Sequence, residues 1–479
     1  MNNILSFLVL TLGCKLNQLE SESLTGAFIQ AGFILCKEQS TIGRPAGLPS
    51  IVIINTCTVT SKADQKARRV IRKALRDYPD SCVIVTGCYA QLNKDDLLNL
   101  DLSKKQRLFV IDKNSILQLP DNINKTSDFF EAVRNWKTSI NHSSFFASNS
   151  FQFNPERFSS HTRSFLKIQD GCDKHCTYCR IRLARGPSIS LDADQVLARL
   201  RILEENHAEA VLTGVNICQY RSPVMSHVRE EANNLAELLD YLLCGTKTIS
   251  LRLSSLAPES IDEKLTSVFS NKRIRPHFHL SIQSGSEKIL EKMGRSYNGE
   301  TIKRAIAMLR GAKDDPFIAC DIITGFHGET EEEFLKTYEL CQKAGFSWIH
   351  VFPYSKRPGT PAWSFTETVQ EKEITKRVQL LTNLAWECKV NYVRRWLGRE
   401  VDVLIENREL GMKGKKQSAD NRDQFEVSCF GVSENYLKLL VQYKSEKAPL
   451  PGTVLRCKLL KESNLKEYDA IAVCTVKIF

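Results

Sequence analysis

The sequence predicts a mixed α/β protein built from an N-terminal parallel α/β unit, a central open barrel of six strand–helix units and a small C-terminal all-β barrel. Three observations lead to this fold class. Short apolar runs alternate with helical patterns near the N-terminus, six longer strand candidates alternate with helical stretches in the middle, and short alternating segments separated by turn residues follow Trp396. A chain of 479 residues is also too long for a single hydrophobic core.

The predicted boundaries divide the chain into three domains and a linker. The linker is rich in Ser, Asn and Phe and has no clear period. We expect an N-terminal domain at 1–120, the linker at 121–157, a central domain at 158–388 and a C-terminal domain at 396–479.

The N-terminal unit contains a strongly basic helical pattern. Residues 61–76 carry seven Lys or Arg and one Asp, with apolar residues at helical spacing on the opposite face, and Ser61 with Asp64 resembles a capping box. Residues 389–479 are also basic, with 17 Lys or Arg and 12 Asp or Glu. Each region is either a solvated surface or a phosphate-contacting face, and the net charge of +11 makes a nucleic-acid partner plausible.

Cysteine usage points to metal or catalytic chemistry. The opening run MNNILSFLVLTLGC superficially resembles a short signal sequence, but it lacks a preceding Lys or Arg, and we predict a buried first strand instead. No apolar run approaches the ~20 residues of a membrane span. We therefore expect a cytoplasmic protein without membrane association, in which the sixteen cysteines are reduced.

Three cysteines lie within eight positions in DGCDKHCTYC, at Cys172, Cys176 and Cys179, just after the first strand of the central domain. A zinc site with His175 as fourth ligand is the alternative, but His175 and Cys176 are adjacent, which makes joint tetrahedral ligation awkward. A four-iron cluster normally takes four thiolates. Three thiolates would leave one iron open to bind a small molecule.

The spacing Cys-x3-Cys-x-aromatic-Cys, here with Tyr178, is similar to the signature of radical S-adenosylmethionine (SAM) enzymes. The resemblance implies that the open iron holds SAM and that its reductive cleavage gives a 5′-deoxyadenosyl radical. The segments LTGVN, HLSIQSGSEKILEKMGR and DIITGFHGET resemble later strand ends of that superfamily. The residues that the resemblance places in the cofactor pocket are Tyr178, Gly214, Asn216, Gln283 and Ser284.

A second trio, Cys14, Cys57 and Cys88, follows three apolar strands of the N-terminal unit, and in a parallel sheet all three would lie at one edge. Three unrelated buried thiols are the alternative. The trio resembles the auxiliary-cluster ligands of methylthiotransferases, which implies two 4Fe-4S clusters. GCKLNQ, NTCTVTSKAD and HVFPYSKRPGTPAW look most like the tRNA threonylcarbamoyladenosine methylthiotransferases, and the C-terminal domain is similar to their RNA-binding TRAM domain.

This resemblance implies an enzyme that methylthiolates carbon 2 of N6-threonylcarbamoyladenosine at position 37 of tRNA. The implied partners are a tRNA anticodon stem-loop and a reducing electron donor; the oligomeric state stays open. Arg357 is the candidate for reading the substrate carboxylate. The chain departs from the family at Arg182 and His327, where proline is usual.

Three other functions are weighed against this one. A sister enzyme acting on isopentenyladenosine tRNA, or one acting on a ribosomal protein, would share both cysteine trios, although the latter would be expected to have an acidic or neutral C-terminal domain. A non-catalytic RNA-binding iron–sulfur protein would not need a cluster with an open iron.

Overall fold

The computed structural model describes most of the chain. The described residues are 5–36, 48–101, 107–113, 115–123, 129–139, 150–155, 162–223, 232–407, 427–443, 449–463 and 467–477. The predicted fold class is confirmed: a parallel N-terminal sheet, a central set of parallel strands and a closed C-terminal β-barrel are all present.

The N-terminal domain is built on a five-stranded parallel sheet in the order β2-β1-β3-β4-β5. The central strands β3 and β4 are buried along their whole length, as expected for a parallel sheet covered on both faces. The strands are β1 (Ser6–Thr11), β2 (Ile34–Leu35), β3 (Ile51–Thr56), β4 (Cys82–Gly87) and β5 (Leu108–Val110). The helices of this region are α1 (Lys15–Gln30), α2 (Ser61–Asp77), α3 (Cys88–Leu92) and α4 (Lys94–Leu98).

Helix α2 matches the predicted basic helix but begins differently. Its N-cap is Thr60, whose hydroxyl accepts a hydrogen bond from the Ala63 N–H, so Ser61 is not the capping residue. Asp64 instead bonds the Thr58 hydroxyl at 2.9 Å. Ala67, Ile71 and Ala74 face the sheet, which leaves most of the basic side chains exposed.

The segment expected as a linker contains regular structure. The 3-10 helix η1 (Ile116–Gln118) and α5 (Leu119–Ile123) precede it or overlap its start, and α6 (Phe129–Ser139) lies within it. Val133 and Trp136 of α6 are buried in the same apolar cluster as Phe7 of β1. This helix has a single buried stripe of few residues in a Ser- and Asn-rich setting, which gives little periodic signal.

The central domain contains all six predicted strands. They form two parallel three-stranded sheets, β6-β9-β12 and β13-β14-β15, linked by isolated parallel bridges that join Leu251 to Ile274 and Leu256 to Leu280. The strands are β6 (Ser164–Lys167), β9 (Glu209–Thr213), β12 (Ser250–Leu253), β13 (His277–Gln283), β14 (Phe317–Thr324) and β15 (Trp348–Pro353).

Helices and short ribbons connect these strands, and the main helices pack their apolar faces on them. The helices are α7 (Ile181–Arg185), α8 (Ala193–Glu204), η2 (Ile217–Gln219), α9 (Leu235–Gly245), η3 (Pro258–Ser260), α10 (Glu263–Phe269), α11 (Glu287–Lys292), α12 (Gly299–Ala312), α13 (Glu331–Ala344) and η4 (Pro361–Ser364). The short strands are β7 (Gln169–Asp170), β8 (Ile189–Ser190), β10 (Ser222–Pro223) and β11 (Ala232–Asn233).

The C-terminal domain is a closed barrel in the order β16-β17-β18-β20-β19. Its strands are β16 (Glu400–Asn407), β17 (Val427–Ser433), β18 (Lys438–Tyr443), β19 (Val454–Glu462) and β20 (Ala470–Lys477). The long helix α14 (Glu371–Trp396) runs into it, and Tyr392 and Trp396 share one apolar cluster with Phe317 of β14 and the barrel core. The barrel therefore packs on the central domain as part of a common core.

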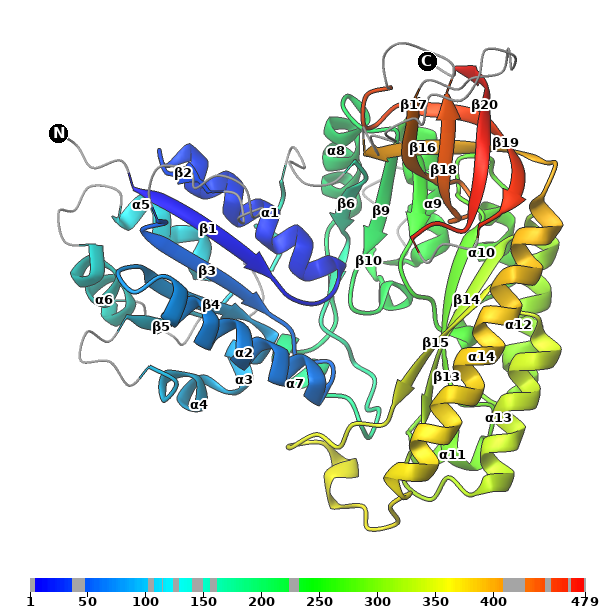
Figure 1. Ribbon diagram of the computed structural model, residues 1–479, viewed down its shortest axis with the longest axis horizontal. Coiled ribbons are helices and arrows are strands. Elements are labelled where there is room, and N and C mark those ends of the chain that lie inside the picture. The colour runs from blue at the N-terminus through cyan, green and yellow to red at the C-terminus, as the bar shows by residue number, and fades with distance from the viewer. Residues whose placement is uncertain are drawn as a thin grey trace, which may run out of the picture.

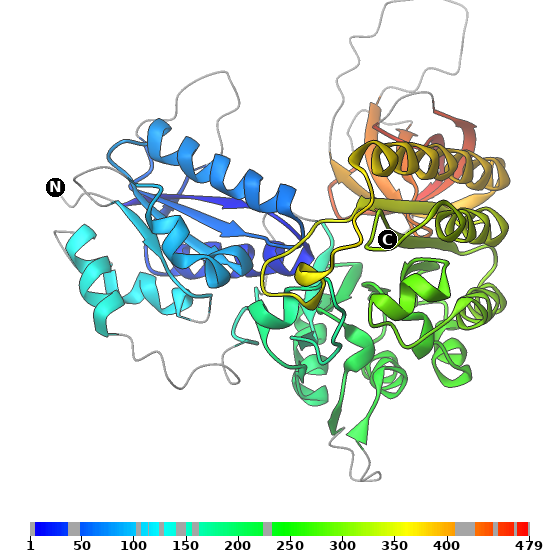
Figure 2. The same ribbon diagram turned by 90° about the horizontal axis from the view of Figure 1, so that it is seen from below.

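The domains are arranged around the central strands. The N-terminal sheet lies on one side, and the C-terminal barrel lies at one end of the central domain (Figures 1 and 2). Within the part of the chain that the structure describes, no helix is both long and apolar enough to cross a membrane.

Candidate active site

The three N-terminal cysteines lie where the sequence predicted, at the carboxyl ends of neighbouring strands. Cys14 is the N-cap of α1 after β1, Cys57 follows β3, and Cys88 is the first residue of α3 after β4. Because β1, β3 and β4 are adjacent and parallel, the three thiols share one edge of the sheet. Cys14 is exposed, whereas Cys57 and Cys88 are buried.

Glycine is required where the first of these loops approaches the second. Gly13 has a φ of +115°, and a Cβ at this position would lie 2.4 Å from the Cys57 Cβ. Burial and the neighbouring Cys14 together raise the pKa of the Cys57 thiol to about 12. Coordination would replace the protons of these thiols, since a metal binds the thiolate.

The central trio lies in the loop between β7 and α7. This loop is fastened on both sides: the Thr177 N–H donates to the Met293 carbonyl at 3.0 Å, and the Ala362 N–H donates to the Thr177 carbonyl at 2.8 Å. Cys172, Cys176 and Cys179 are each partly exposed. Burial raises the pKa of Cys179 to about 11, and the nearby Cys176 and Cys172 add to this shift.

The donor sets fit iron–sulfur clusters better than single metal ions. Among the described residues, no three His, Cys, Asp or Glu side chains converge on one metal position. A zinc site needs such convergence, whereas the thiolates of a four-iron cluster bind separate irons and stand further apart. Each trio supplies three free thiols, which are the ligand type of iron–sulfur clusters.

Arg185 joins the two cysteine sites. This guanidinium is almost fully buried; its Nε lies 3.1 Å from the Sγ of Cys88, and its Nη1 lies 2.9 Å from Glu20 and 3.1 Å from Asp170. Asp170 is two residues before Cys172. One side chain thus bonds a thiol of the N-terminal trio and the strand that leads into the central trio.

The charges around Arg185 leave an excess of positive charge. Lys167 and Lys113 also bond Asp170, at 2.6 and 3.1 Å, so that three buried cations face the carboxylates of Glu20 and Asp170. These cations hold the pKa of Asp170 well below its usual value despite burial. The negative charge of thiolate ligands at Cys88 would complete the balance.

Two of the predicted cofactor-pocket residues lie beside the central trio. Asn216 lies close enough to Cys172 to act on the pKa of its thiol, and the backbone N–H of Asn216 donates to the Gln169 Oε1 at 2.9 Å. A Cβ on Gly214 would lie 2.8 Å from the same Oε1, so the loop after β9 can approach β7 only because this residue is glycine.

The other three predicted pocket residues differ in their surroundings. Tyr178 accepts a hydrogen bond from Arg295 at 2.6 Å and packs edge-on against Phe326. Gln283 ends β13 with a φ of +70°, a strained backbone of the kind that gathers at functional sites. Ser284 is fully buried and its hydroxyl lies 3.1 Å from that of Thr337 on α13. Ser284 therefore fixes the strand end against a helix.

Arg357 is not open to solvent in this structure. Its Nη2 lies 2.8 Å from Asp64 of α2 and donates to the Thr58 hydroxyl at 2.6 Å and the Thr58 carbonyl at 2.9 Å. Only 3% of the side chain is exposed. The guanidinium joins the loop after β15 to the N-terminal domain, so its predicted role toward the substrate would require this pairing to be shared or opened.

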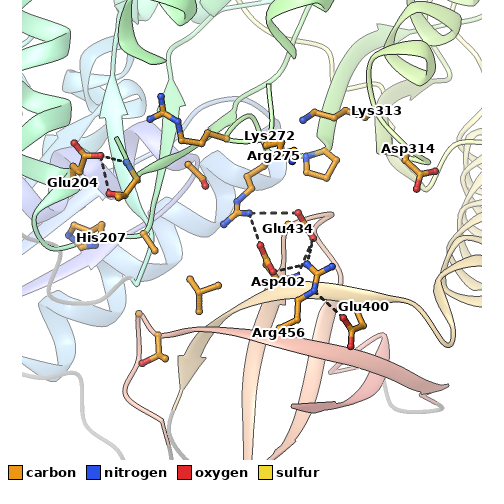
Figure 3. A pocket seen from close by; sticks show the side chains of 18 of the residues that line it. Glu204, His207, Lys272, Arg275, Lys313, Asp314, Glu400, Asp402, Glu434 and Arg456 are labelled. Carbon is orange, nitrogen blue, oxygen red and sulfur yellow. Dashed lines mark hydrogen bonds and ion pairs between the residues drawn. The ribbon is translucent and has the colours of Figure 1, made fainter. Parts of the chain in front are cut away.

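A large cleft lies at the other end of the central strands. It has a volume of about 1140 Å³ and is lined by residues that precede β9, β12 and β13 and by residues of the C-terminal barrel. Arg275 faces Asp402 and Glu434, and Arg456 bonds Asp402 at 2.8 Å (Figure 3). Because it lies at the strand starts and its arginines are paired with acids, this cleft is separate from the cysteine sites.

Sequence reasoning missed Arg185, Glu20 and Asp170. Asp170 and Arg185 flank the cysteine motif in DGCDKHCTYCRIRLARG. The charge of Asp170, placed between a strand and the cysteine loop, could have indicated a role near the site. Glu20 has no such signal, because its partner comes from another domain.

Comparison with known protein families agrees with the geometry of both sites. The model of the radical SAM superfamily matches residues 166–341, which contain the central trio, and the model called uncharacterized protein family UPF0004 matches residues 6–108, which contain the N-terminal trio. The class of protein is therefore a radical SAM protein with an N-terminal UPF0004 domain.

Curated relatives narrow this class. The threonylcarbamoyladenosine tRNA methylthiotransferase MtaB of Treponema pallidum is 38% identical over 83% of this chain and 90% of its own length, and that of Bacillus subtilis is 31% identical over 94% and 93%. A tRNA-2-methylthio-N(6)-dimethylallyladenosine synthase of Thermotoga petrophila is 29% identical over 84% and 86%. The chain belongs to the MtaB family of threonylcarbamoyladenosine tRNA methylthiotransferases.

Proposed function

We propose that this protein replaces the hydrogen on carbon 2 of N6-threonylcarbamoyladenosine, at position 37 of tRNA, with a methylthio group. The observation that carries this proposal is the pair of cysteine trios joined through Arg185, since one catalytic site and one sulfur-handling site must act on the same carbon. Membership of the MtaB family supports the threonylcarbamoyl substrate over the isopentenyl substrate and over a ribosomal protein.

Each trio would hold a 4Fe-4S cluster. Cys172, Cys176 and Cys179 would leave one iron open for SAM, and Cys14, Cys57 and Cys88 would hold the auxiliary cluster. When bound, these groups supply the radical that activates an aromatic C–H bond and the sulfur and methyl group that replace the hydrogen.

The protein's own residues would position these groups. Asn216 lies beside the Cys172 thiol, and Gly214, two residues before it, lets the loop after β9 approach β7. Tyr178 and Gln283 stay the proposed contacts of SAM, whereas the hydroxyl of Ser284 already faces Thr337. Arg185 supplies a hydrogen bond to Cys88 and positive charge between the two sites.

A basic surface stands beside the site for the tRNA anticodon stem-loop. Ser61 at the start of α2 hydrogen-bonds Ser355 in the loop after β15, so α2 lies near the carboxyl ends of the central strands. The exposed basic residues of α2 are Lys62, Lys66, Arg69, Arg72, Lys73 and Arg76. Phosphate contacts here would position the RNA, and the modified base would supply specificity.

The C-terminal barrel would act as a TRAM-like RNA-binding domain. Its closed five-stranded form supports this role. We also place the enzyme in the cytoplasm, where tRNA and a reducing electron donor are present and where its sixteen cysteines would stay reduced.

Mass spectrometry of tRNA nucleosides tests the proposal in cells. A strain lacking the gene should contain threonylcarbamoyladenosine without its 2-methylthio derivative, and the intact gene should restore the derivative, whereas a Cys176→Ala version should not. Loss of the 2-methylthio form of isopentenyladenosine instead would move the protein to the neighbouring family. An unchanged tRNA profile would contradict the proposal altogether.

A further inference from the structure

A polar cluster that includes none of the cysteines and cations described above lies on one face of the β13-β14-β15 sheet. It consists of His279, Asp321 and His350, one from each strand. Cys320 of β14 is buried in the same apolar cluster as Cys341 of helix α13, so the alternate residues of β14 on the side of Cys320 face that helix. Asp321 is therefore on the opposite face, and the register places it directly beside His350. We call this the inner face.

Residues beside each cysteine site interact electrostatically with residues on or next to the inner face. The Tyr297 hydroxyl is within electrostatic reach of both Cys176 and Asp321, and Lys15, which follows Cys14, is within electrostatic reach of His350. His279 and Asp321 are each about one-fifth exposed, and His350 is exposed. A substrate that is reached from both trios would contact these side chains.

The hydrogen bonds fix the protonation of His350. The indole N–H of Trp348, which can only donate, lies 3.3 Å from the His350 Nδ1, so Nδ1 accepts. Partial burial, together with the neighbouring His279, lowers the pKa of His350 to about 4. The ring is therefore neutral at pH 7 with its proton on Nε2. No hydrogen bond to this Nε2 occurs among the described residues, so it is an available donor.

His279 and Asp321 hold the Nε2–H donor of His350 in place. The His279 Nε2 lies 2.9 Å from the Asp321 Oδ1, and the His279 Nδ1 lies 3.3 Å from the Ser255 hydroxyl. The His279 and His350 ring centroids are 5.0 Å apart. Both nitrogens of His279 are thus engaged, whereas Asp321 retains a second carboxylate oxygen that could accept from a ligand N–H.

We propose that His350 is a specificity-determining residue whose Nε2–H donates a hydrogen bond to an oxygen of the threonylcarbamoyl group, with His279 and Asp321 as positioning residues. This inference rests on the proposed function. The threonylcarbamoyl group offers carbonyl and carboxylate oxygens and an N–H, which match a donor beside an acceptor. The isopentenyl group offers no polar atom, so it could pair with neither the His350 donor nor the Asp321 acceptor.

The test compares the affinity of the reconstituted enzyme for three anticodon stem-loops by fluorescence anisotropy. They carry threonylcarbamoyladenosine, isopentenyladenosine or unmodified adenosine at position 37. The parent enzyme should prefer the first. His350→Leu should reduce this preference by about 10- to 100-fold, the size of one hydrogen bond to a charged acceptor, and leave affinity for the unmodified loop unchanged.

Two further variants separate recognition from folding. His350→Gln keeps an N–H donor at the end of the side chain and should recover part of the preference. His207→Leu, at a histidine of the distant cleft, should keep the parent's preference. If His350→Leu discriminates like the parent, or if His350→Gln falls with it to the same extent, His350 does not read this group. If the parent enzyme neither prefers the threonylcarbamoyladenosine loop nor forms product on it, the proposed function itself is wrong.

Discussion

The Arg185 guanidinium donates a hydrogen bond to the Cys88 Sγ across the boundary between the N-terminal and central domains, with Nε and Sγ 3.1 Å apart. Arg185 comes from the helix that follows the central cysteine loop, and Cys88 comes from the edge of the N-terminal sheet. The two sites are thus held in register by one buried side chain. With Cys88 as the proposed ligand of the auxiliary cluster, this hydrogen bond would tune the reduction potential of that cluster.

The first prediction concerns this contact. Arg185→Gln would leave Glu20 and Asp170 without their shared partner, and we expect a loss of about 3 kcal/mol in the free energy of unfolding, measured by urea denaturation. Arg182→Gln, an exposed position on the same helix, should change it by less than about 0.5 kcal/mol. Equal losses of unfolding free energy in the two variants would show that the buried network around Arg185 contributes no more to stability than the exposed position does.

The second prediction concerns metal content. Anaerobically reconstituted protein should contain about eight irons, and Cys176→Ala and Cys57→Ala should each retain about four. Cys36→Ala, at a partly exposed cysteine outside both trios, should retain all eight. Iron analysis with electron paramagnetic resonance distinguishes the two clusters, and zinc in place of iron would refute the assignment.

The third prediction concerns pH. Glu209 lies 2.7 Å from Arg252 and 3.0 Å from Arg275, and these arginines lower its pKa to about 2 although burial opposes them. Because the folded pKa lies below that of the unfolded chain, the stabilisation is complete above about pH 4.5 and is lost as the pH falls toward 2. The difference in unfolding free energy between the parent and Glu209→Gln should be constant from pH 5 to 7 and shrink by pH 3.5. A constant difference throughout would contradict this.

The fourth prediction concerns tRNA. Lys66→Ala with Arg69→Ala on the exposed face of α2 should weaken tRNA binding and reduce the salt dependence of affinity by about one in log–log slope for each lost phosphate contact. Lys303→Ala with Arg304→Ala, exposed on α12, removes the same charge elsewhere and serves as the control. The measurement is a set of tRNA-binding titrations at several salt concentrations. Equal slopes of log affinity against log salt for the two double variants would exclude α2 from the interface.

These charge substitutions test tRNA contact more specifically than removal of the C-terminal barrel would. Tyr436 of the barrel stacks on His277 at a centroid distance of 4.0 Å, and Phe317 lies in the barrel's apolar cluster. Truncation after Trp396 would expose this shared core, so a loss of tRNA affinity would not separate RNA contact from instability.

Sequence patterns predicted the strands and both cysteine trios because these depend on local periodicity and on strand ends, which parallel sheets bring to one edge. The linker assignment missed α6, whose buried residues pack on a partner distant in the chain. The sequence patterns also could not predict contacts between domains. Nothing local in SKRPGT indicates that Arg357 pairs with Asp64, or that Glu20 meets Arg185.

The inner-face cluster shows the same limit. His279, Asp321 and His350 lie on three strands separated by long helical connections, and each alone is an ordinary strand residue. Only the register of β14 with β15 and the contact between His279 and Asp321 bring them together.

The most direct measurement is the product formed by the reconstituted enzyme with SAM, a reductant and a sulfur source on an anticodon stem-loop that carries threonylcarbamoyladenosine. Mass spectrometry should show the 2-methylthio derivative on this loop and little or none on the isopentenyl loop, with Cys57→Ala cleaving SAM to 5′-deoxyadenosine yet forming no product. Product on the isopentenyl loop alone, or on neither loop, would contradict the central claim.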